Sequence, residues 1–332
     1  MKKASFDDVI ILPQSENAGL HKGVDTFTFG PLVSELDYGF AHHHRSGRIA
    51  TNVSQMWQYR GINEPKFQGS YFYGGAFDYH FGHFLAECLG RLHGWESSGR
   101  HKIVWCPTYK GTGLRWLLKL PEWQKDILTY CGIRTDDIIF ITAPTCIERL
   151  LVVESGMWLY QTPSSEQILW LKRRQDVFNK SVNNKSSNSR KIFVSRAKIE
   201  SVNKGRICGI ETIEKGLSAA GYVTIYPEKL SIWTQLSLYA HAEKLVFEDG
   251  SALHLLELFG RLDAEIAILP RGKRLGKQFA SAIGPRAVNE IWTYKGKVWE
   301  DELEKQSITL RARQTYLDVA QLLDELREAN FI

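Results

Sequence analysis

The C-terminal half of the chain alternates short apolar runs with amphipathic segments. Apolar runs typical of buried strands lie at residues 191–196, 222–227, 244–249 and 264–270. Apolar side chains recur at helical spacing in residues 211–221, 232–242 and 251–261. Strands that alternate with helices predict βαβ units around a parallel sheet. We therefore expect a Rossmann-like domain over residues 191–312.

The N-terminal half, residues 1–178, has a less regular pattern. Its apolar runs predict strands at residues 101–107, 136–142 and 146–154. Residues 114–132 predict a helix that is broken at Pro121, because proline removes a backbone donor and clashes with the preceding turn. We expect a second α/β domain here.

Two further segments indicate how the domains are connected. Residues 179–190 are polar, rich in Asn and Ser and without apolar periodicity, which predicts a linker. Residues 313–332 have the apolar spacing of a final helix. Because this helix follows the last predicted strand, we expect it to pack back on the N-terminal domain. A chain of 332 residues also exceeds the usual size of a single core, which favours two domains.

Composition and charge exclude several classes of protein. With 43% hydrophobic and 24% charged residues, the chain has the composition of a soluble globular protein. Its net charge of +5 is too small and too scattered to predict nucleic-acid binding. No run of about 18 apolar residues predicts a membrane span, and the N-terminus lacks the pattern of a signal peptide. Five cysteines without a CxxC spacing favour reduced thiols, so we expect a cytoplasmic protein.

Residues 79–95 predict an amphipathic helix with an unusual polar side. At about 100° per residue, His80, His83, Glu87 and Arg91 fall in one sector, opposite a set of apolar side chains. This polar side is a water-facing surface, a metal site or an acid–base site. For a metal site, His83 and Glu87 have i, i+4 spacing, but there is no HExxH motif and no evident third ligand.

The segment HFGHFLAECLGRL, residues 80–92, resembles the N-terminal signature of glycosyltransferase family 61. His83 and Glu87 fall on the family's histidine and acidic positions, and Arg91 falls on the arginine of its LxRL-type ending. His80 stands where the family usually has Asn, so the resemblance does not define its role.

The C-terminal half contains further motifs of the same family, in the same order. Arg196 in KIFVSR falls on a strand-end arginine, and Arg206 and Glu211 fall on an Arg…Asn-Glu element. The Asn of that element is replaced here by Ile210. The stretch GYVTIYPEKLSIWTQLSLYAHAEKLVFEDGSAL then follows the family's pattern up to its GSaL element.

This resemblance covers about residues 70–270 and implies an α/β fold of the GT-B type, in which two Rossmann-like domains face a cleft. It implies a nucleotide-sugar donor in the C-terminal domain and a glycan or lipid-linked acceptor in the N-terminal domain. It also implies inversion at the anomeric carbon, without a metal ion or other cofactor. A role in surface polysaccharide synthesis, in the cytoplasm and with peripheral contact to the inner face of the membrane, is expected on the same basis.

Asp249, Gly250 and Ser251 are predicted to bind the donor. They end a predicted strand just before a helix, where open α/β sheets bind ligands. Gly250 would admit a diphosphate close to the backbone, and Ser251 would cap the helix or bond a phosphate oxygen. The alternative is a tight turn with a serine cap and no ligand.

Arg196, Arg206 and Glu228 complete the predicted donor site. The two arginines would neutralise the diphosphate, because a metal-independent enzyme has no Mg²⁺ to share that charge. Glu228 follows another predicted strand and would accept hydrogen bonds from ribose hydroxyls. The alternative for each is an ordinary surface residue. The basic loop at 271–277 either contacts the donor or an anionic acceptor, or faces water.

Glu87 and His83 are the candidates for the base that direct displacement requires, and the sequence does not decide between them. His80 and Arg91 are predicted to lie on the acceptor side. The alternative function is a nucleotide-sugar-binding or -modifying protein without transferase activity. Such a protein would need no acid–base residues in its first domain.

Overall fold

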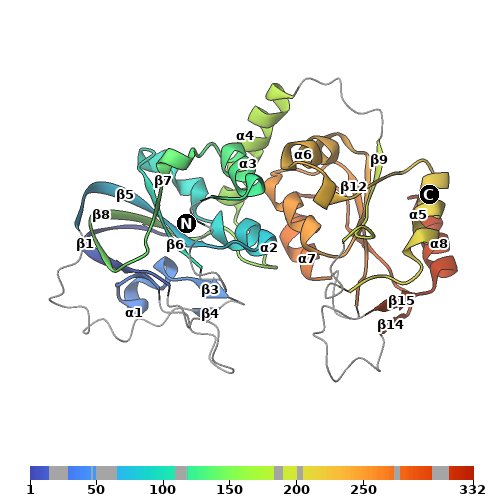
Figure 1. The fold of residues 1–332 in the computed structure, drawn as a ribbon, viewed down its shortest axis with the longest axis horizontal. Helices are drawn as coiled ribbons and strands as arrows, with labels where there is room; N and C mark the ends of the chain where they lie inside the picture. The colour runs from blue at the N-terminus through green and yellow to red at the C-terminus, as the bar shows by residue number, and fades with distance from the viewer. Residues whose placement is uncertain are drawn as a thin grey trace. The chain divides into compact units, whose positions relative to one another are not determined.

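The computed structural model describes residues 1–14, 29–45, 48–49, 66–108, 117, 119–182, 190–199, 205–272, 277–300 and 314–332. The chain forms two compact units, Met1–Arg174 and Gln175–Ile332. Each unit contains a β-sheet with helices beside it (Figure 1), which confirms the predicted α/β class.

The N-terminal unit is built on a six-stranded mixed sheet with the order β2-β1-β8-β5-β6-β7. The pairs β8–β5, β5–β6 and β6–β7 are parallel, whereas β1 is antiparallel to both β2 and β8. The strands are β1 (Lys3–Leu12), β2 (Gly30–Pro31), β5 (Lys66–Phe77), β6 (Ile103–Pro107), β7 (Ile138–Phe140) and β8 (Thr145–Val153). The last three confirm the predicted strands of this half. A separate antiparallel pair consists of β3 (His44–Arg45) and β4 (Arg48–Ile49).

The helical segments of the N-terminal unit differ most from prediction. They are α1 (Glu35–Tyr38), η1 (Gly39–Ala41), α2 (Phe81–His83), η3 (Phe84–Cys88), η4 (Leu92–Gly94), η5 (Glu96–Ser98), α3 (Glu122–Tyr130), η7 (Thr135–Asp137) and α4 (Ser165–Ser181). The single regular helix predicted over 79–95 is wrong, because α2 passes into a π-helix at η3 and then into 3₁₀ turns. Of the helix predicted over 114–132, α3 begins directly after Pro121, and residues 111–116 lie outside the described part.

The C-terminal unit is built on a five-stranded parallel sheet with the order β10-β9-β11-β12-β13. Its strands are β9 (Lys191–Val194), β10 (Val223–Ile225), β11 (Lys244–Glu248), β12 (Glu265–Leu269) and β13 (Trp292–Thr293). The first four confirm the predicted strands. The chain passes from β9 outward to β10 and then crosses to β11 on the other side of β9. The carboxyl ends of β9 and β11 therefore form the kind of switch point at which open α/β sheets bind ligands.

The helices of the C-terminal unit connect these strands. They are α5 (Ile210–Ala219), η8 (Pro227–Lys229), α6 (Ile232–His241), η9 (Ser251–Leu258), α7 (Lys277–Ile283) and η10 (Gly284–Arg286). α5 and α6 confirm two predicted helices, and Ser231 caps α6 by accepting a hydrogen bond from the backbone N–H of Thr234 at 3.1 Å. The α-helix predicted over 251–261 is wrong, because η9 has 3₁₀ geometry.

The end of the chain stays with the C-terminal unit. Its elements are β14 (Val298–Glu300), β15 (Thr315–Leu317) and α8 (Val319–Glu328). Leu322 and Leu326 of α8 are fully buried in a core that includes Ile213 and Leu217 of α5, and Figure 1 shows the two helices side by side. The prediction that the last helix packs on the N-terminal domain is therefore wrong. Asp318 alone separates β15 from α8, so the helix is held beside the apolar face of α5.

The boundary between the two units falls within α4, between Arg174 and Gln175. Residues 179–181, predicted as the start of a linker, form the end of this helix, and residues 183–189 lie outside the described part. The facing arrangement expected of a GT-B fold stays a prediction.

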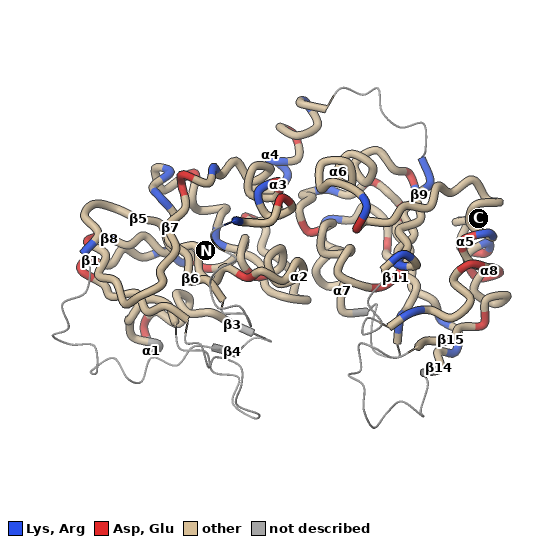
Figure 2. Tube along the Cα trace, in the orientation of Figure 1, with Lys and Arg blue, Asp and Glu red and all other residues tan. Residues whose placement is uncertain are grey.

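The described residues show neither a membrane span nor a disulfide. No helix among them is long and apolar enough to cross a membrane. All five cysteines lie in described segments, and none forms a disulfide. Charged residues of both signs follow one another along both units (Figure 2), in agreement with the small net charge.

Candidate functional site

A pocket of about 170 Å³ lies at the switch point of the C-terminal sheet. It is formed where β9 and β11 end and where α5 begins. The polar and backbone groups that line it come from Arg196, Arg206, Gly209, Glu211, Glu248 and Gln314. Two of the predicted donor-binding residues, both arginines, are therefore brought to one pocket.

Glu248 joins the ends of the two central strands. Its Oε1 accepts hydrogen bonds from the backbone N–H of Arg196 at 2.6 Å and from Ser195 Oγ at 3.0 Å. Burial raises the pKa of this carboxyl, although both hydrogen bonds and the charge of Arg196 act in the opposite direction. Glu248 was not among the residues predicted from the sequence. In the sequence, Glu248 and Asp249 form an acidic pair at the end of an apolar strand, and only Asp249 was chosen as a candidate.

Arg196 is a half-buried cation held over the switch point. Burial is the main cause that lowers the pKa of its guanidinium to about 10, and the positive charge of Arg271 acts in the same direction. Arg196 therefore stays protonated at neutral pH in an environment that disfavours its charge. Glu248, Asp249 and Glu228 partly offset this effect. An arginine in this state is well suited to pair with an anion from solution.

Gly250 makes room for Arg196. A Cβ at position 250 would lie 2.5 Å from Nη1 of Arg196, so a larger residue would displace the guanidinium. The residue was predicted to admit a diphosphate, and its direct neighbour in the structure is this arginine. Gly250 therefore acts on the pocket through the position of Arg196.

The other predicted donor residues do not line the pocket. Asp249 is 1% exposed, and its backbone carbonyl accepts a hydrogen bond from Arg271 Nε at 3.0 Å. Glu228, on η8, is close enough to act electrostatically on Arg196. The predicted capping role of Ser251 is wrong, since Gly250 occupies the N-cap position of η9 and no side chain caps that helix.

The N-terminus of α5 contributes the third side of the pocket. Gly209 occupies its N-cap position with φ +77°, a left-handed conformation that suits glycine, and no side chain caps the helix there. Arg206, an exposed residue, donates from Nη2 to the backbone carbonyl of Ile199 at 2.6 Å, which fixes its guanidinium near this turn. Two arginines and a helix N-terminus, the groups that proteins commonly use to bind phosphate, therefore meet in this pocket together with the carboxyl groups of Glu211 and Glu248.

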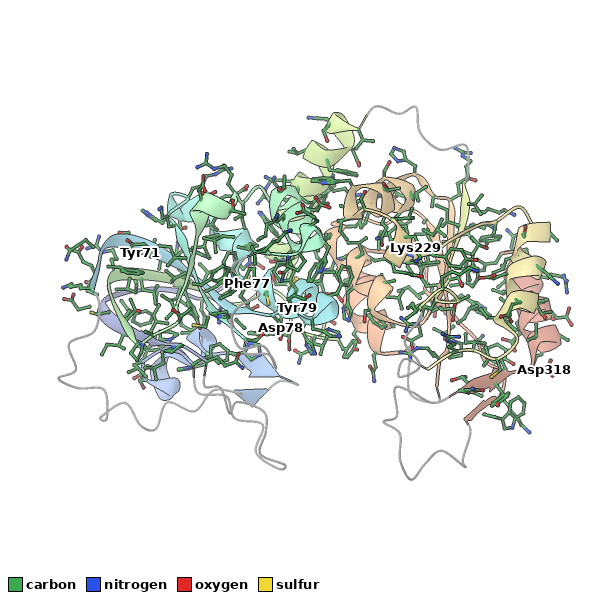
Figure 3. All side chains as sticks on the ribbon, in the orientation of Figure 1. Tyr71, Phe77, Asp78, Tyr79, Lys229 and Asp318 are labelled. Carbon is green, nitrogen blue, oxygen red and sulfur yellow. The ribbon has the colours of Figure 1, made fainter. Side chains whose placement is uncertain are left out.

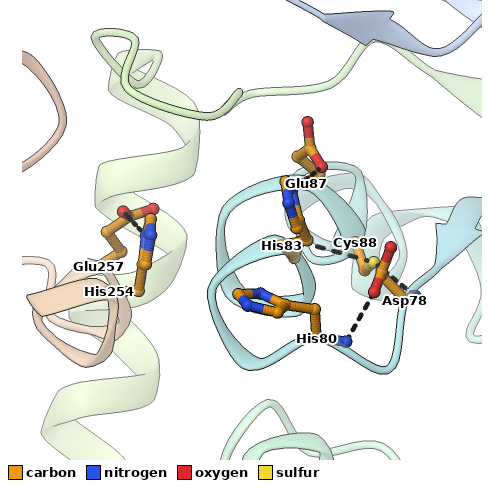
Figure 4. Close-up of polar contacts among 7 residues, drawn as sticks. All are labelled: Asp78, His80, His83, Glu87, Cys88, His254 and Glu257. Atoms are coloured by element: carbon orange, nitrogen blue, oxygen red, sulfur yellow. Dashed lines mark hydrogen bonds and ion pairs between the residues drawn. The ribbon is translucent and has the colours of Figure 1, made fainter. Parts of the chain in front are cut away.

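In the N-terminal unit, His83 and Glu87 form a close pair (Figure 4). Nδ1 of His83 lies 2.8 Å from Oε2 of Glu87, and the side chains are 24% and 3% exposed. The interpretation of a water-facing polar surface is therefore wrong for Glu87. A buried carboxylate that holds one imidazole nitrogen leaves the other nitrogen to act on a substrate, as in acid–base sites.

The turn before α2 places a second imidazole beside this pair. Phe77, Asp78 and Tyr79 lead from the end of β5 into α2 (Figure 3). Oδ1 of Asp78 accepts a hydrogen bond from the backbone N–H of His80 at 2.6 Å (Figure 4). The ring of His80, an exposed residue, lies 5.1 Å from the ring of His83.

Arg91 was predicted on the acceptor side, and the structure corrects this. The residue is 3% exposed, and its guanidinium donates hydrogen bonds to the backbone carbonyls of Phe40, His42 and Val153. The guanidinium also lies over the ring of Tyr73. Arg91 therefore stabilises the unit from within and does not present its charge to a ligand.

A second His–Glu pair, not predicted from the sequence, lies within the C-terminal unit. Nδ1 of His254 is 2.7 Å from Oε1 of Glu257 (Figure 4), and both residues are almost fully buried. The ring of Phe279 packs on His254. Because neither side chain reaches solvent, we assign this pair to the stability of η9.

The described residues offer no evident metal centre. No group of three or more His, Cys, Asp or Glu side chains among them is arranged to hold a metal ion. The pair His83 and Glu87 would supply two ligands.

The parallel sheet and the arginine-lined pocket at its switch point define an α/β protein suited to a phosphorylated ligand. The sequence model of the family described as Glycosyltransferase 61 matches residues 81–257, more than half of the 332 residues. The chain therefore belongs to glycosyltransferase family 61, which confirms the resemblance seen in its motifs and makes the protein a glycosyltransferase. The matched region includes the His83–Glu87 pair and the two pocket arginines. No curated protein matches the chain.

Proposed function

We propose that the protein is an inverting glycosyltransferase that moves a sugar from a nucleotide-sugar donor to a hydroxyl of a glycan or glycolipid. The observation that carries this proposal is the pocket at the switch point of the C-terminal sheet, where Arg196, Arg206 and the N-terminus of α5 meet. Membership of glycosyltransferase family 61 supports the reaction class.

In this proposal the diphosphate of the donor is held by the two arginines. Arg196 is a cation in a partly desolvated position, so pairing with phosphate oxygens would relieve the cost of its burial. Glu228 would accept hydrogen bonds from donor hydroxyls. The charge of the leaving group is neutralised by side chains and the helix N-terminus, so no metal ion is required.

The transfer is a direct displacement. The acceptor oxygen attacks the anomeric carbon, the bond from that carbon to the diphosphate oxygen breaks, and the bonding electrons leave on the nucleoside diphosphate. The acceptor proton passes to His83, whose Nδ1 is held by Glu87 and whose Nε2 receives the proton. The exposures of the two side chains favour this assignment, because His83 reaches solvent and Glu87 does not. Glu87 would orient the imidazole and stabilise its charged form.

The biological setting is part of the same proposal. We propose a role in surface polysaccharide synthesis in the cytoplasm, at the inner face of the membrane. The five cysteines without disulfides support a reducing compartment. The alternative of a nucleotide-sugar-binding protein without transferase activity leaves the His83–Glu87 pair without a role.

Thermal stabilisation by a panel of nucleotide sugars tests the proposal. A ligand that binds the native state alone raises the melting temperature, by an amount equivalent to about 2.7 kcal/mol at a hundred times its dissociation constant. We expect stabilisation by one donor class and by its nucleoside diphosphate. In Arg196→Met this stabilisation should be lost, while the melting temperature without ligand stays the same or rises, because burial of the arginine charge disfavours the fold.

Arg327→Met is the matched control, since Arg327 is an exposed residue of α8 that pairs with Asp324. This variant should keep the full stabilisation by nucleotide. If no nucleotide sugar or nucleoside diphosphate stabilises the wild-type protein, the proposed function is wrong. If Arg196→Met is stabilised as strongly as the wild type, the donor site has been misplaced.

A further inference from the structure

Three partly exposed aromatic side chains form a cluster in the N-terminal unit. They are Tyr79, Phe81 and Trp123, which we call the aromatic platform. The ring of Trp123 lies 6.4 Å from that of Tyr79 and 5.2 Å from that of Phe81, both in edge-to-face geometry. The fully buried ring of Phe84 supports Trp123 from the core side, at 5.5 Å. Large aromatic rings that stay partly in solvent although they contact one another are suited to cover a ligand.

The platform is fixed by polar contacts between its two segments. Gln124, next to Trp123 in α3, is fully buried, and its Nε2 donates a hydrogen bond to the backbone carbonyl of Asp78 at 2.8 Å. The carboxylate of Asp78 in turn accepts from the backbone N–H of His80. These bonds hold the start of α3 against the turn before α2. The rings are therefore ordered before any ligand arrives, which lowers the entropy cost of binding.

The segment that carries two rings of the platform also carries two histidines. His80 lies in sequence between Tyr79 and Phe81, and its ring is 5.1 Å from that of His83. His83 is in turn bonded to Glu87 at 2.8 Å. Residues 79–83 thus supply two aromatic rings together with two imidazoles that donate or accept hydrogen bonds.

We propose that the aromatic platform binds a sugar ring of the acceptor by stacking, with hydroxyls of that sugar directed to His80 and His83. A pyranose or furanose ring has one face of C–H groups and an edge of hydroxyls, which matches this surface. The C–H groups carry partial positive charge and meet the negative faces of the aromatic rings. The inference rests on the proposed function for the role of that sugar as acceptor. It defines the acceptor as a glycan recognised through its own sugar ring.

Two other ligand classes fit the platform less well. A lipid chain would pack on the aromatic rings, but it has no hydroxyls to bond with the imidazoles of His80 and His83. A nucleobase would stack, but it has no hydroxyls of its own for the imidazoles. Both classes are therefore outcomes of the test.

Saturation-transfer NMR on the full-length protein tests the inference. The probes are methyl glycosides of glucose, galactose, mannose, xylose, rhamnose and N-acetylglucosamine, together with uridine, guanosine and octyl alcohol. We expect transfer to the ring C–H protons of at least one glycoside. Trp123→Ala should weaken this binding by about tenfold or more, as expected for the loss of one stacked ring.

Two further variants keep the result clear if Trp123→Ala is unstable. Trp123→Phe keeps a ring in contact with Phe84, so it should bind the glycosides more strongly than Trp123→Ala does. Tyr79→Ala should weaken glycoside binding while Trp123, the centre of the platform, stays in place. Trp299→Ala is the matched control, because Trp299 is 48% exposed on β14 and belongs to the C-terminal unit. It should bind glycosides as the wild type does.

Several outcomes would overturn the proposal that the aromatic platform binds a sugar ring. These are no transfer to any glycoside, transfer that survives Trp123→Ala and Tyr79→Ala unchanged, and transfer to the nucleosides or the alcohol alone. Nucleoside diphosphate binding, measured on the same samples by thermal stabilisation, separates this inference from the proposed function. If the wild-type protein binds glycosides but no nucleoside diphosphate, the result counts against the proposed donor site. If it binds nucleoside diphosphate but no glycoside, the result counts against the aromatic platform.

Discussion

Glu248 shows how single residues shape the pocket at the switch point. It is 2% exposed, it joins the ends of β9 and β11 through Ser195 and Arg196, and burial raises its pKa. A carboxyl with a raised pKa binds its proton more tightly in the folded state than in the unfolded state. Ionisation of Glu248 therefore costs the folded protein free energy. The hydrogen bonds from Ser195 and Arg196 offset this cost only in part.

This residue predicts a specific pH dependence of stability. As pH rises from the ordinary glutamate pKa of 4.5 to the raised pKa of Glu248, its contribution should lower the free energy of unfolding, and the loss should persist at higher pH. Glu248→Gln keeps an acceptor oxygen for the Arg196 N–H but has no proton to lose, so the variant should show less of this decline. Urea unfolding between about pH 4 and about pH 8 measures the effect.

Glu290→Gln is the control for this experiment, because Glu290 is an exposed carboxylate in the same unit. It should reproduce the wild-type profile. An identical pH profile for Glu248→Gln and the wild type would show that the buried carboxyl is not the source of the decline.

At the scale of elements, the π-helical turn η3 creates the His83–Glu87 geometry. In a regular α-helix, side chains at i and i+4 lie on one face, so both residues would share the polar surface. The wider turn over Phe84–Cys88 instead places Glu87 inside the unit while its carboxylate still reaches His83. Single π-turns within helices are frequent at functional sites. The half-exposed imidazole is thereby held by a buried partner.

The packing of α8 on α5 gives a prediction about stability. Leu326 of α8 is fully buried in the core of the C-terminal unit. Leu326→Ala should therefore lower the free energy of unfolding by about 2–5 kcal/mol, the range for a leucine removed from a packed core. Chemical unfolding monitored by tryptophan fluorescence measures this loss.

Leu169→Ala provides the comparison, because Leu169 is 56% exposed on α4. Its effect should stay within about 0.5 kcal/mol. If Leu326→Ala is equally silent, α8 does not pack on α5 in solution.

At the scale of the whole molecule, sequence periodicity predicted the C-terminal sheet better than the N-terminal one. Strands β9, β11 and β12 have apolar runs that are mostly buried, and such runs stand out between amphipathic helices. Strand β5 did not stand out, because it contains three glycines, and its register is irregular between Tyr73 and Gly75. A Cβ at Gly74 would collide with the indole of Trp105, so the glycine is required by a residue far away in the sequence.

The part of the candidate site that depends on topology alone, the position of Arg196, was predictable from the sequence. Arg196 follows a strand and lies at its carboxyl end by the rule for parallel sheets. The π-turn at η3 and the burial of Arg91 depend on tertiary packing, so the helical periodicity placed Glu87 and Arg91 on a polar surface. The aromatic platform joins Tyr79 and Phe81 to Trp123, a contact that the local pattern does not reveal.

In the proposed reaction, His83 removes the acceptor proton, and the switch-point pocket binds the donor. The most direct test is the rate of nucleoside diphosphate release in the presence of acceptor, measured for the wild type and for His83→Ala. We expect the rate to fall by about 10²- to 10⁴-fold, with the affinity for nucleoside diphosphate unchanged. His241→Ala, which alters an exposed imidazole at the end of α6, should keep the wild-type rate. A wild-type rate in His83→Ala would contradict the account.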